Sequence, residues 1–146
     1  MPKFFTLQQA EKVLPEVEPP MREAIALKSE YQTAETEWQN FSKRVALLGG
    51  VLVDHSQLIE QKQRRDASAQ RLKAAIEKIH EYGCLVKDLD TGLVDFPTLL
   101  NGVEVYLCWK LGEHGIHFWH GVEEGFRGRK PIDQDFLEHH DGGLPN

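Results

Sequence analysis

One stretch of the sequence, CWKLGEHGIHFWH at residues 108–120, is dense in residues that bind metals or transfer protons. It holds one cysteine, one glutamate, three histidines and two tryptophans in thirteen positions. Thiolates and imidazoles are zinc ligands, and imidazoles and carboxylates are the usual acids and bases of enzymes. Whether these side chains meet at one place depends on the elements that carry them.

The spacing predicts a β-hairpin whose turn spans residues 112–115, with its two glycines opposite each other. Because side chains alternate between the faces of a strand, the three histidines point to three different places and cannot bind one ion. Glu113 and His120 are also too far apart along the strand to cooperate. In this register His120 shares the apolar face with Trp109 and Phe118, and a shift of one residue turns it to the other face.

Cys108 and His117 share the opposite face of the predicted hairpin as diagonal neighbours. A thiolate and an imidazole suit a soft ion such as zinc, but a tetrahedral zinc site takes three or four protein ligands. The simpler interpretation of this pair is a buried thiol beside a surface imidazole.

His120 is the stronger candidate, because an imidazole on an apolar face needs a hydrogen-bond partner for each buried nitrogen. The preceding hairpin offers the carboxylates of Asp88, Asp90 and Asp95. Asp95 is the first choice and Asp88 the second, since the LVDF segment turns Asp95 away from its apolar neighbours. One interpretation is a structural pair of His120 with a carboxylate. The other is a metal or substrate site formed by Asp88, Asp95 and His120, residue types that suit a divalent metal ion as a cofactor.

The N-terminal part of the chain, residues 1–83, is predicted to be a helical hairpin that forms an arm. Thr6, followed three residues later by Gln9, is a capping-box pattern and indicates a short helix that begins here. Pro15 and the proline pair at 19–20 are expected to interrupt it, because a proline removes a backbone donor and clashes with the preceding turn.

Two long helices are expected beyond these prolines, over residues 21–48 and 54–82, each followed by a glycine end signal. A short connection makes such helices pack antiparallel. Residues 11–40 hold seven glutamates against three basic residues, and residues 54–83 hold six basic against five acidic ones. We therefore expect ion pairs between the two helices.

The arm is expected to form a homo-oligomer, most simply a dimer through a coiled coil. Polar residues interrupt its apolar seam, and Tyr31, Trp38 and Phe41 offer more aromatic surface than one hairpin can cover. The sequence does not specify a further small-molecule or protein partner.

Residues 84–132 are predicted to form a small antiparallel β module of about four strands. Turn signals at residues 90–92 and at Asn101-Gly102 separate runs of alternating apolar residues. Residues 133–146 are expected to be a flexible tail. The predicted fold is α+β in a single domain, with a long antiparallel helical hairpin packed against the sheet.

The composition is ordinary for a globular protein, with 40% hydrophobic and 27% charged residues. A net charge of −6 argues against binding to nucleic acid or to an anionic membrane. No apolar run reaches the roughly 18 residues that cross a bilayer, and the N-terminus lacks a signal-peptide pattern. Two cysteines form no disulfide framework, so we expect a cytoplasmic protein with free thiols. Sequence motifs of nucleotide-binding loops, HExxH proteases, CxxC pairs and serine hydrolases are absent.

Four segments carry a resemblance to a known family: FTLQQAEKVLPEV, VKDLDTGLVDFP, GVEVYLCWKLGE and FWHGVEEGFRGRKPI. In this order, and over nearly the whole chain, they resemble the prokaryotic family catalogued as domain of unknown function 2203. The resemblance implies a small cytosolic bacterial protein with helices followed by β-strands, and it implies no activity. The pattern of the family falls on Lys87, Asp88, Gly92, Asp95, Cys108, Trp109, Gly112, Glu113, Trp119, His120, Gly125 and Arg129.

The resemblance favours the Asp95–His120 pair, because both residues fall within the pattern of the family. His114 and His117 fall at positions that the pattern leaves open, which weakens the pairing of Cys108 with His117. Four other residues of the pattern are candidates for ligand binding: Trp109, Glu113, Trp119 and Arg129.

Two functions from different classes remain open. The first, which we favour, is a binding and assembly protein, in which the β module binds a small ligand, ion or protein and the arm oligomerises. The second is a small metal-dependent, hydrolase-like enzyme, with Asp88, Asp95 and His120 as ligands and Glu113 or Lys87 as the acid–base group. A metal assay on protein purified without a histidine tag distinguishes the two.

Overall fold

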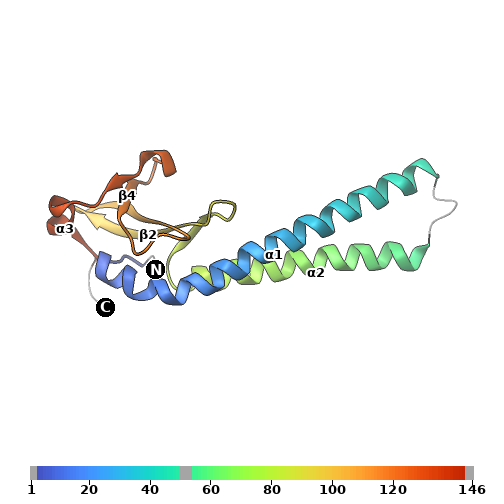
Figure 1. Cartoon of the computed structure of the whole chain (residues 1–146), viewed down its shortest axis with the longest axis horizontal. Helices are drawn as coiled ribbons and strands as arrows, with labels where there is room; N and C mark the ends of the chain where they lie inside the picture. Colours follow the sequence, from blue (N-terminus) through green and yellow to red (C-terminus); the bar gives the residue numbers. More distant parts are fainter. Residues whose placement is uncertain (1–2, 50–53, 144–146) are drawn as a thin grey trace.

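A computed structural model describes residues 3–49 and 54–143 of the 146-residue chain. Two long helices lie side by side and project from a sheet as an arm (Figure 1). In chain order the elements are α1 Leu7–Leu47, α2 His55–His80, β1 Leu85–Asp88, β2 Leu93–Leu100, β3 Val103–Lys110, β4 Phe118–Gly121, the 3-10 helix η1 Phe126–Gly128, β5 Lys130–Pro131, α3 Gln134–His139 and β6 His140–Asp141. This is the α+β architecture predicted from the sequence.

Helix α1 begins at the predicted capping box, in which the Gln9 amide donates to the Thr6 hydroxyl and the Thr6 amide donates to the Gln9 side chain. The predicted interruption by prolines was wrong, because α1 continues through Pro15, Pro19 and Pro20. The same part of the helix packs its apolar side chains into the core. This burial outweighs the backbone hydrogen bonds that the prolines remove. The buried side chains are Ala10, Val17, Pro20, Met21 and Ala24.

Helix α2 begins at Asp54, whose carboxylate accepts hydrogen bonds from two backbone amides, and it packs along α1. Three ion pairs join the two helices, as the charge pattern predicted. Two of the pairs are largely exposed, and the third, Glu35–Arg65, is half-buried but long, so each adds at most about 1 kcal/mol to stability. The pairs are Glu37–Arg64 at 2.8 Å, Glu30–Arg71 at 3.5 Å and Glu35–Arg65 at 3.8 Å.

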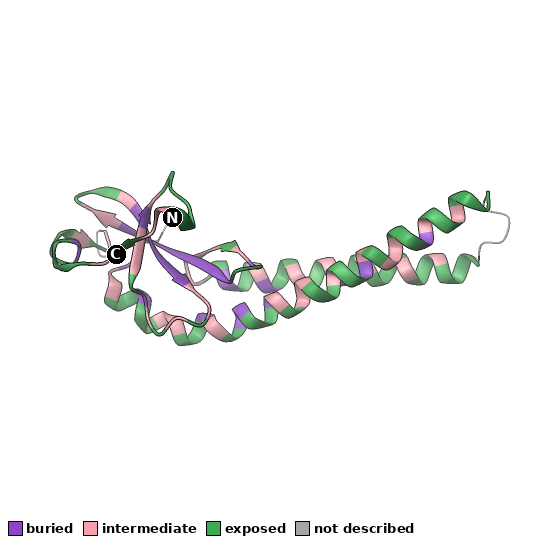
Figure 2. Ribbon diagram, turned by 45° about the horizontal axis from the view of Figure 1, so that its top comes forward, coloured by how far each residue is buried: buried purple, intermediate pink, exposed green. Residues whose placement is uncertain are grey.

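Buried side chains become sparse along the arm away from the sheet (Figure 2). Phe41 is buried, so it does not add to the exposed aromatic surface that we expected there. Large apolar side chains are instead exposed near the tip of the arm, at Leu47, Leu48 and Ile59. Among the described residues no helix is long and apolar enough to cross a membrane.

The sheet has six strands, two more than the approximate number predicted. Its order is β1-β2-β3-β4-β5, with β6 paired to β2, and the pairs are antiparallel. Asn101 and Gly102 both have positive φ, of 52° and 80°, and form the predicted turn between β2 and β3. In place of the tail expected over residues 133–146, α3 and β6 return the chain to β2. Residues 144–146 of that segment lie outside the described residues.

Both faces of the central strands are buried, and they differ in character. One face contributes Val94, Phe96, Leu107 and Trp109 to the main apolar core, together with side chains of α1. The opposite face carries polar side chains that are also shielded from water. Buried polar groups require partners, so this second face is the candidate location of a functional site.

Candidate metal centre

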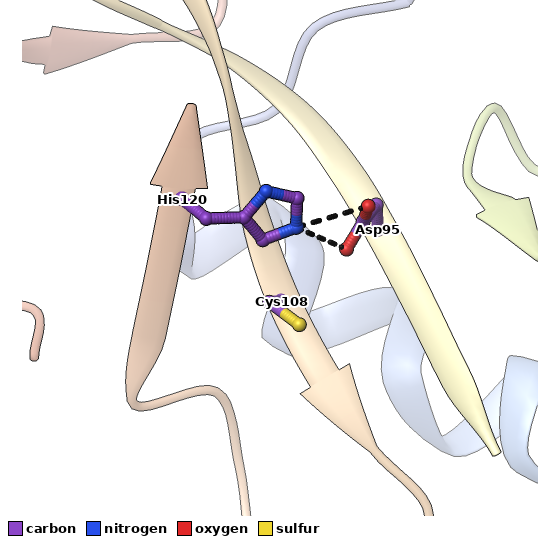
Figure 3. Close-up of side chains that lie close together, drawn as sticks. All are labelled: Asp95, Cys108 and His120. Atoms are coloured by element: carbon purple, nitrogen blue, oxygen red, sulfur yellow. Dashed lines mark hydrogen bonds and ion pairs between the residues drawn. The ribbon is translucent and has the colours of Figure 1, made fainter. Parts of the chain in front are cut away.

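Three side chains that can bind a metal ion meet on the polar face of the sheet: Asp95 on β2, Cys108 on β3 and His120 on β4 (Figure 3). One ligand atom from each lies within 4.8 Å of the other two. The residues are 1%, 1% and 4% exposed, respectively. No other group of three His, Cys, Asp or Glu side chains comes as close within residues 3–49 and 54–143.

The strand register brings these side chains together. Asp95 lies directly opposite Cys108, and His120 lies directly opposite Tyr106. Tyr106 and Cys108 are two residues apart on β3 and therefore share a face. Three neighbouring strands thus contribute one ligand each to the same face.

The predicted register of the β3–β4 hairpin was wrong by one residue. It placed Leu107 opposite His120, whereas Tyr106 occupies that position. The Lys110 amide donates to the Glu113 carboxylate at 2.7 Å instead of pairing with β4. The connection from β3 to β4 is therefore a longer loop than the predicted two-residue turn.

This shift decides which partner His120 can reach. In the predicted register His120 shares a face with Trp109, whereas in the structure it shares the face of Asp95. The predicted pairing of His120 with Asp95 is confirmed. The two side chains meet because the β3–β4 register differs by one residue from the predicted one.

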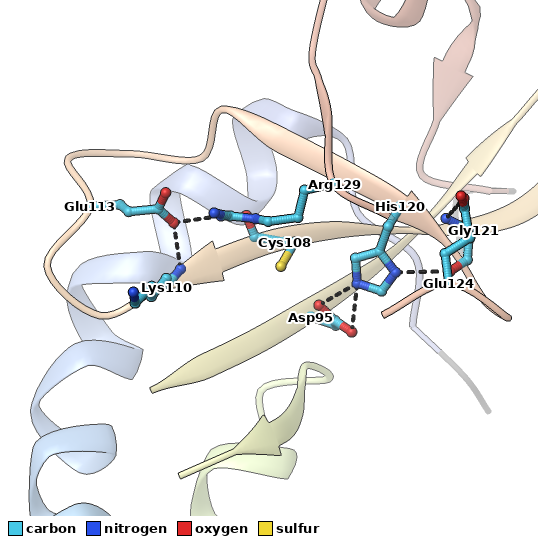
Figure 4. Close-up of polar contacts among 8 residues, drawn as sticks. All are labelled: Asp95, Cys108, Lys110, Glu113, His120, Gly121, Glu124 and Arg129. Atoms are coloured by element: carbon cyan, nitrogen blue, oxygen red, sulfur yellow. Dashed lines mark hydrogen bonds and ion pairs between the residues drawn. The ribbon is translucent and has the colours of Figure 1, made fainter. Parts of the chain in front are cut away.

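Both ring nitrogens of His120 have partners (Figure 4). Nε2 lies 3.0 and 3.1 Å from the two carboxylate oxygens of Asp95, and Nδ1 lies 2.8 Å from the carbonyl oxygen of Gly121. A carbonyl oxygen can only accept, so Nδ1 carries a proton and donates it. In a neutral ring Nε2 then turns a lone pair towards the carboxylate. The two facing acceptors need a proton or a metal ion between them.

The pKa values of Asp95 and Cys108 show that burial disfavours the charged forms of both groups when no ion is bound. Burial raises the pKa of Asp95, and hydrogen bonds with His120 and Cys108 offset only part of this effect. Burial, with the nearby Asp95 charge, raises the pKa of the Cys108 thiol to about 12, although Arg129 opposes the shift. Cys108 is therefore a neutral thiol in the metal-free protein. His120 has no nitrogen free to activate it, which argues against a cysteine nucleophile.

Arg129 provides a positive charge beside Cys108. Its Nη2 donates to the Cys108 carbonyl oxygen at 3.1 Å and to the Glu113 carboxylate at 2.6 Å. The guanidinium carbon lies 4.3 Å from the ring centroid of Phe118 and 5.0 Å from that of Phe126. Burial alone would raise the pKa of Glu113, but Arg129 and a backbone amide lower it by hydrogen bonding. This ion pair holds the β3–β4 loop against β3.

A family model described as "Uncharacterized conserved protein (DUF2203)" matches residues 3–132. The chain belongs to this family. The matched range contains all three side chains of the candidate metal centre. Comparison with curated proteins and with solved structures gave no match. The family description names no activity, so a function has to be argued from the geometry.

The third predicted ligand, Asp88, does not join the group. Its carboxylate accepts hydrogen bonds from the Asp90 amide and the Thr91 hydroxyl, both at 2.9 Å, and these contacts lower its pKa. The third member of the group is Cys108. His117 is exposed, and its ring contacts the carbonyl oxygen of its own loop at His114, so it is not a partner of Cys108.

The four residues predicted to bind a ligand have partners within the fold. The Trp109 indole donates to the Glu113 carbonyl oxygen at 3.1 Å, and Trp119 packs against Phe136 with ring centroids 5.1 Å apart. Glu113 and Arg129 form the ion pair described above. These contacts give all four a structural role, whatever they bind in addition.

Proposed function

We propose that this protein binds a divalent transition-metal ion, with zinc as the best fit, through Asp95, Cys108 and His120. The supporting observation is the convergence of three buried ligand groups in which Nε2 of His120 faces a carboxylate. A thiolate combined with an imidazole suits zinc better than magnesium or calcium, which prefer oxygen ligands. Three protein ligands leave one position of a tetrahedral ion open.

The surroundings of the three ligands support this proposal. A metal-bound histidine usually donates its other ring N–H to a carbonyl or carboxylate, and His120 donates to Gly121. The charge of Arg129 favours the thiolate form of Cys108. Zinc bonds of about 2.0–2.3 Å place tetrahedral ligand atoms about 3.3–3.8 Å apart. Side-chain movements on the order of 1 Å would therefore close the group around an ion.

Two other interpretations of this site are less well supported. A structural histidine–carboxylate pair sharing a proton accounts for Asp95 and His120, with the Cys108 thiol as a further hydrogen-bond partner of Asp95. It gives no reason for three metal-binding side chains to meet on one face. A hydrolase-like enzyme needs an acid–base group at the ion, and Glu113, one of the two candidates, is held by Arg129. The second candidate, Lys87, lines the same pocket as the three ligands, so hydrolysis stays as the second candidate function. Ion binding comes first because it requires only the three side chains that meet in the structure.

The test is a metal titration of protein purified without a histidine tag. Elemental analysis after dialysis should give about one zinc per chain, and Co²⁺ should produce the absorption of a thiolate-bound ion. Asp95→Asn, Cys108→Ala and His120→Gln should each weaken binding at least about tenfold. The matched controls are Asp88→Asn, Cys84→Ala and His117→Gln, which should bind as the wild type does. Equal binding by all six variants would assign the ion to surface histidines and contradict the proposal.

We further propose that the arm associates with a second copy of this chain. A groove of about 390 Å³ on the arm is lined by Tyr31, Leu72 and Ile76, with Lys73 and Glu77 beside them. In an antiparallel α2–α2 contact, Lys73 of one copy faces Glu77 of the other, so the surface is complementary to itself. Sedimentation equilibrium at micromolar concentration tests this, since a mass of 16.7 kDa would show a monomer.

We also expect the protein to act in the cytoplasm. Cys84 and Cys108 are both free and buried, which suits a reducing compartment. The acidic composition supports our expectation that neither nucleic acid nor an anionic membrane is a partner.

A further inference from the structure

A small pocket lies directly over the candidate metal centre. It has a volume of about 130 Å³, and Asp95, Cys108 and His120 are all among its lining residues. The three ligands project from the sheet into this space, so the open position of a bound ion would face the pocket. Apolar side chains form much of the remaining wall: Leu93, Tyr106, Val122 and Phe126.

Two charged side chains reach the pocket, and they differ in their partners. Glu124 is neutralised locally, because its Oε1 accepts from Lys130 at 2.5 Å and from the Gly121 amide at 2.8 Å. Lys87, on β1, has its ammonium group 4.8 Å from the centroid of the Tyr106 ring. No ion pair within the described part of the chain involves Lys87. Its charge also acts on Asp95, whose pKa it lowers slightly against the stronger effect of burial.

The charges around the pocket determine which kind of fourth ligand a bound metal ion prefers. A divalent ion bound by the Asp95 carboxylate, the Cys108 thiolate and a neutral His120 forms a group without net charge. Lys87 then leaves one positive charge facing a largely apolar pocket. A fourth ligand with negative charge is therefore preferred over a neutral one, because it can pair with the ammonium group of Lys87, a side chain that solvent also reaches.

We propose that this pocket binds a small oxyanion, one oxygen of which coordinates the metal ion while another contacts Lys87. This inference rests on the proposed metal binding. The volume corresponds to roughly four water molecules of about 30 Å³ each, so the pocket holds an anionic end group rather than a whole nucleotide or sugar phosphate. Phosphate and carboxylate groups are of this size and offer two oxygens.

The test uses the Co²⁺-loaded protein, because the visible spectrum of Co²⁺ reports its fourth ligand. Inorganic phosphate and acetate are titrated separately, and at least one should change the spectrum to saturation. Lys87→Met should weaken the apparent affinity for that anion about tenfold, the loss of one charge-assisted contact, while the affinity for Co²⁺ stays within about threefold. Lys62→Met, which removes an exposed lysine from α2, is the control and should bind the anion as the wild type does.

The outcomes separate the two proposals. A protein that binds no Co²⁺ contradicts the proposed function itself. A protein that binds Co²⁺ but whose spectrum responds to neither anion retains the metal site and overturns the oxyanion proposal, as expected if Glu124 fills the fourth position. A response that Lys87→Met leaves unchanged also overturns it, because the anion then binds without the contact that we infer.

Discussion

His120 reaches Asp95 across the middle strand of the sheet. Nε2 of the histidine on β4 lies 3.0 Å from Oδ1 of the aspartate on β2, with β3 between them. Cys108 projects from β3 beneath this contact (Figure 3). Because Gly121 makes Nδ1 a donor, the contact holds either a shared proton or a metal ion. The two states respond differently to substitution.

Asp95→Asn should leave the metal-free protein at least as stable as the wild type, whereas His120→Ala should lower the free energy of unfolding by about 1–3 kcal/mol. The asparagine amide supplies the N–H that Nε2 accepts and removes a buried charge. The alanine leaves the Asp95 carboxyl without its partner. Urea denaturation in the presence of a chelator measures both effects. If Asp95→Asn were as damaging as His120→Ala, the proton-sharing geometry would be wrong.

The stability of the metal-free protein relative to Asp95→Asn should fall as the pH rises. Burial raises the pKa of Asp95 above its value of about 3.9 in an unfolded chain, so the folded state binds more protons than the unfolded one. The resulting stabilisation is complete below about pH 3.9 and is lost as the pH rises through the folded pKa. Unfolding free energies of both proteins at pH 4.5 and pH 8 test this. A difference that favours the wild type more strongly at pH 8 has the wrong sign.

Much of the fold follows from local patterns that tertiary contacts do not alter. The capping box at Thr6 and the Asn101-Gly102 turn both lie where the sequence predicts them, and α2 starts beside residue 54, the predicted start of the second helix. The continuity of α1 through its prolines was not predictable from local rules. It depends on packing that buries Val17 and Met21 in the core.

In the candidate site, too, one part follows from local sequence patterns and another part does not. The Asn101-Gly102 turn alone sets Asp95 opposite Cys108, because residues of β2 and β3 pair symmetrically about it. Counting outwards from that turn would have found Cys108 as a neighbour of Asp95. The position of His120 could not be counted in this way, since residues 111–117 separate β3 from β4 and the Lys110 amide donates to the Glu113 carboxylate instead of to β4. No spacing rule encodes that contact.

Neither thiol should react at a measurable rate in the folded protein near neutral pH. Burial raises the pKa of Cys84 to about 11 and that of Cys108 to about 12, so the reactive thiolate is scarce as well as shielded. A chromogenic disulfide reagent should detect no thiol in native protein and two after unfolding without reductant. A disulfide between the two cysteines, or rapid labelling of the native protein, would contradict the structure, in which both are free and buried.

The self-association proposed for the arm should depend on the charges of Lys73 and Glu77. Both residues are exposed on α2, so their substitution should leave the fold intact. Lys73→Glu or Glu77→Lys alone places like charges opposite each other at two symmetric positions and should weaken the dimer about tenfold.

Combining the two substitutions restores opposite charges across the proposed contact, so the double variant should return to the dissociation constant of the wild type. Sedimentation equilibrium of all four proteins at one ionic strength measures this, and circular dichroism controls for folding. A double variant as weak as the singles shows that these residues do not face each other. A wild type that is monomeric at every concentration removes the self-association proposal and leaves the metal centre, which lies in the sheet, untouched.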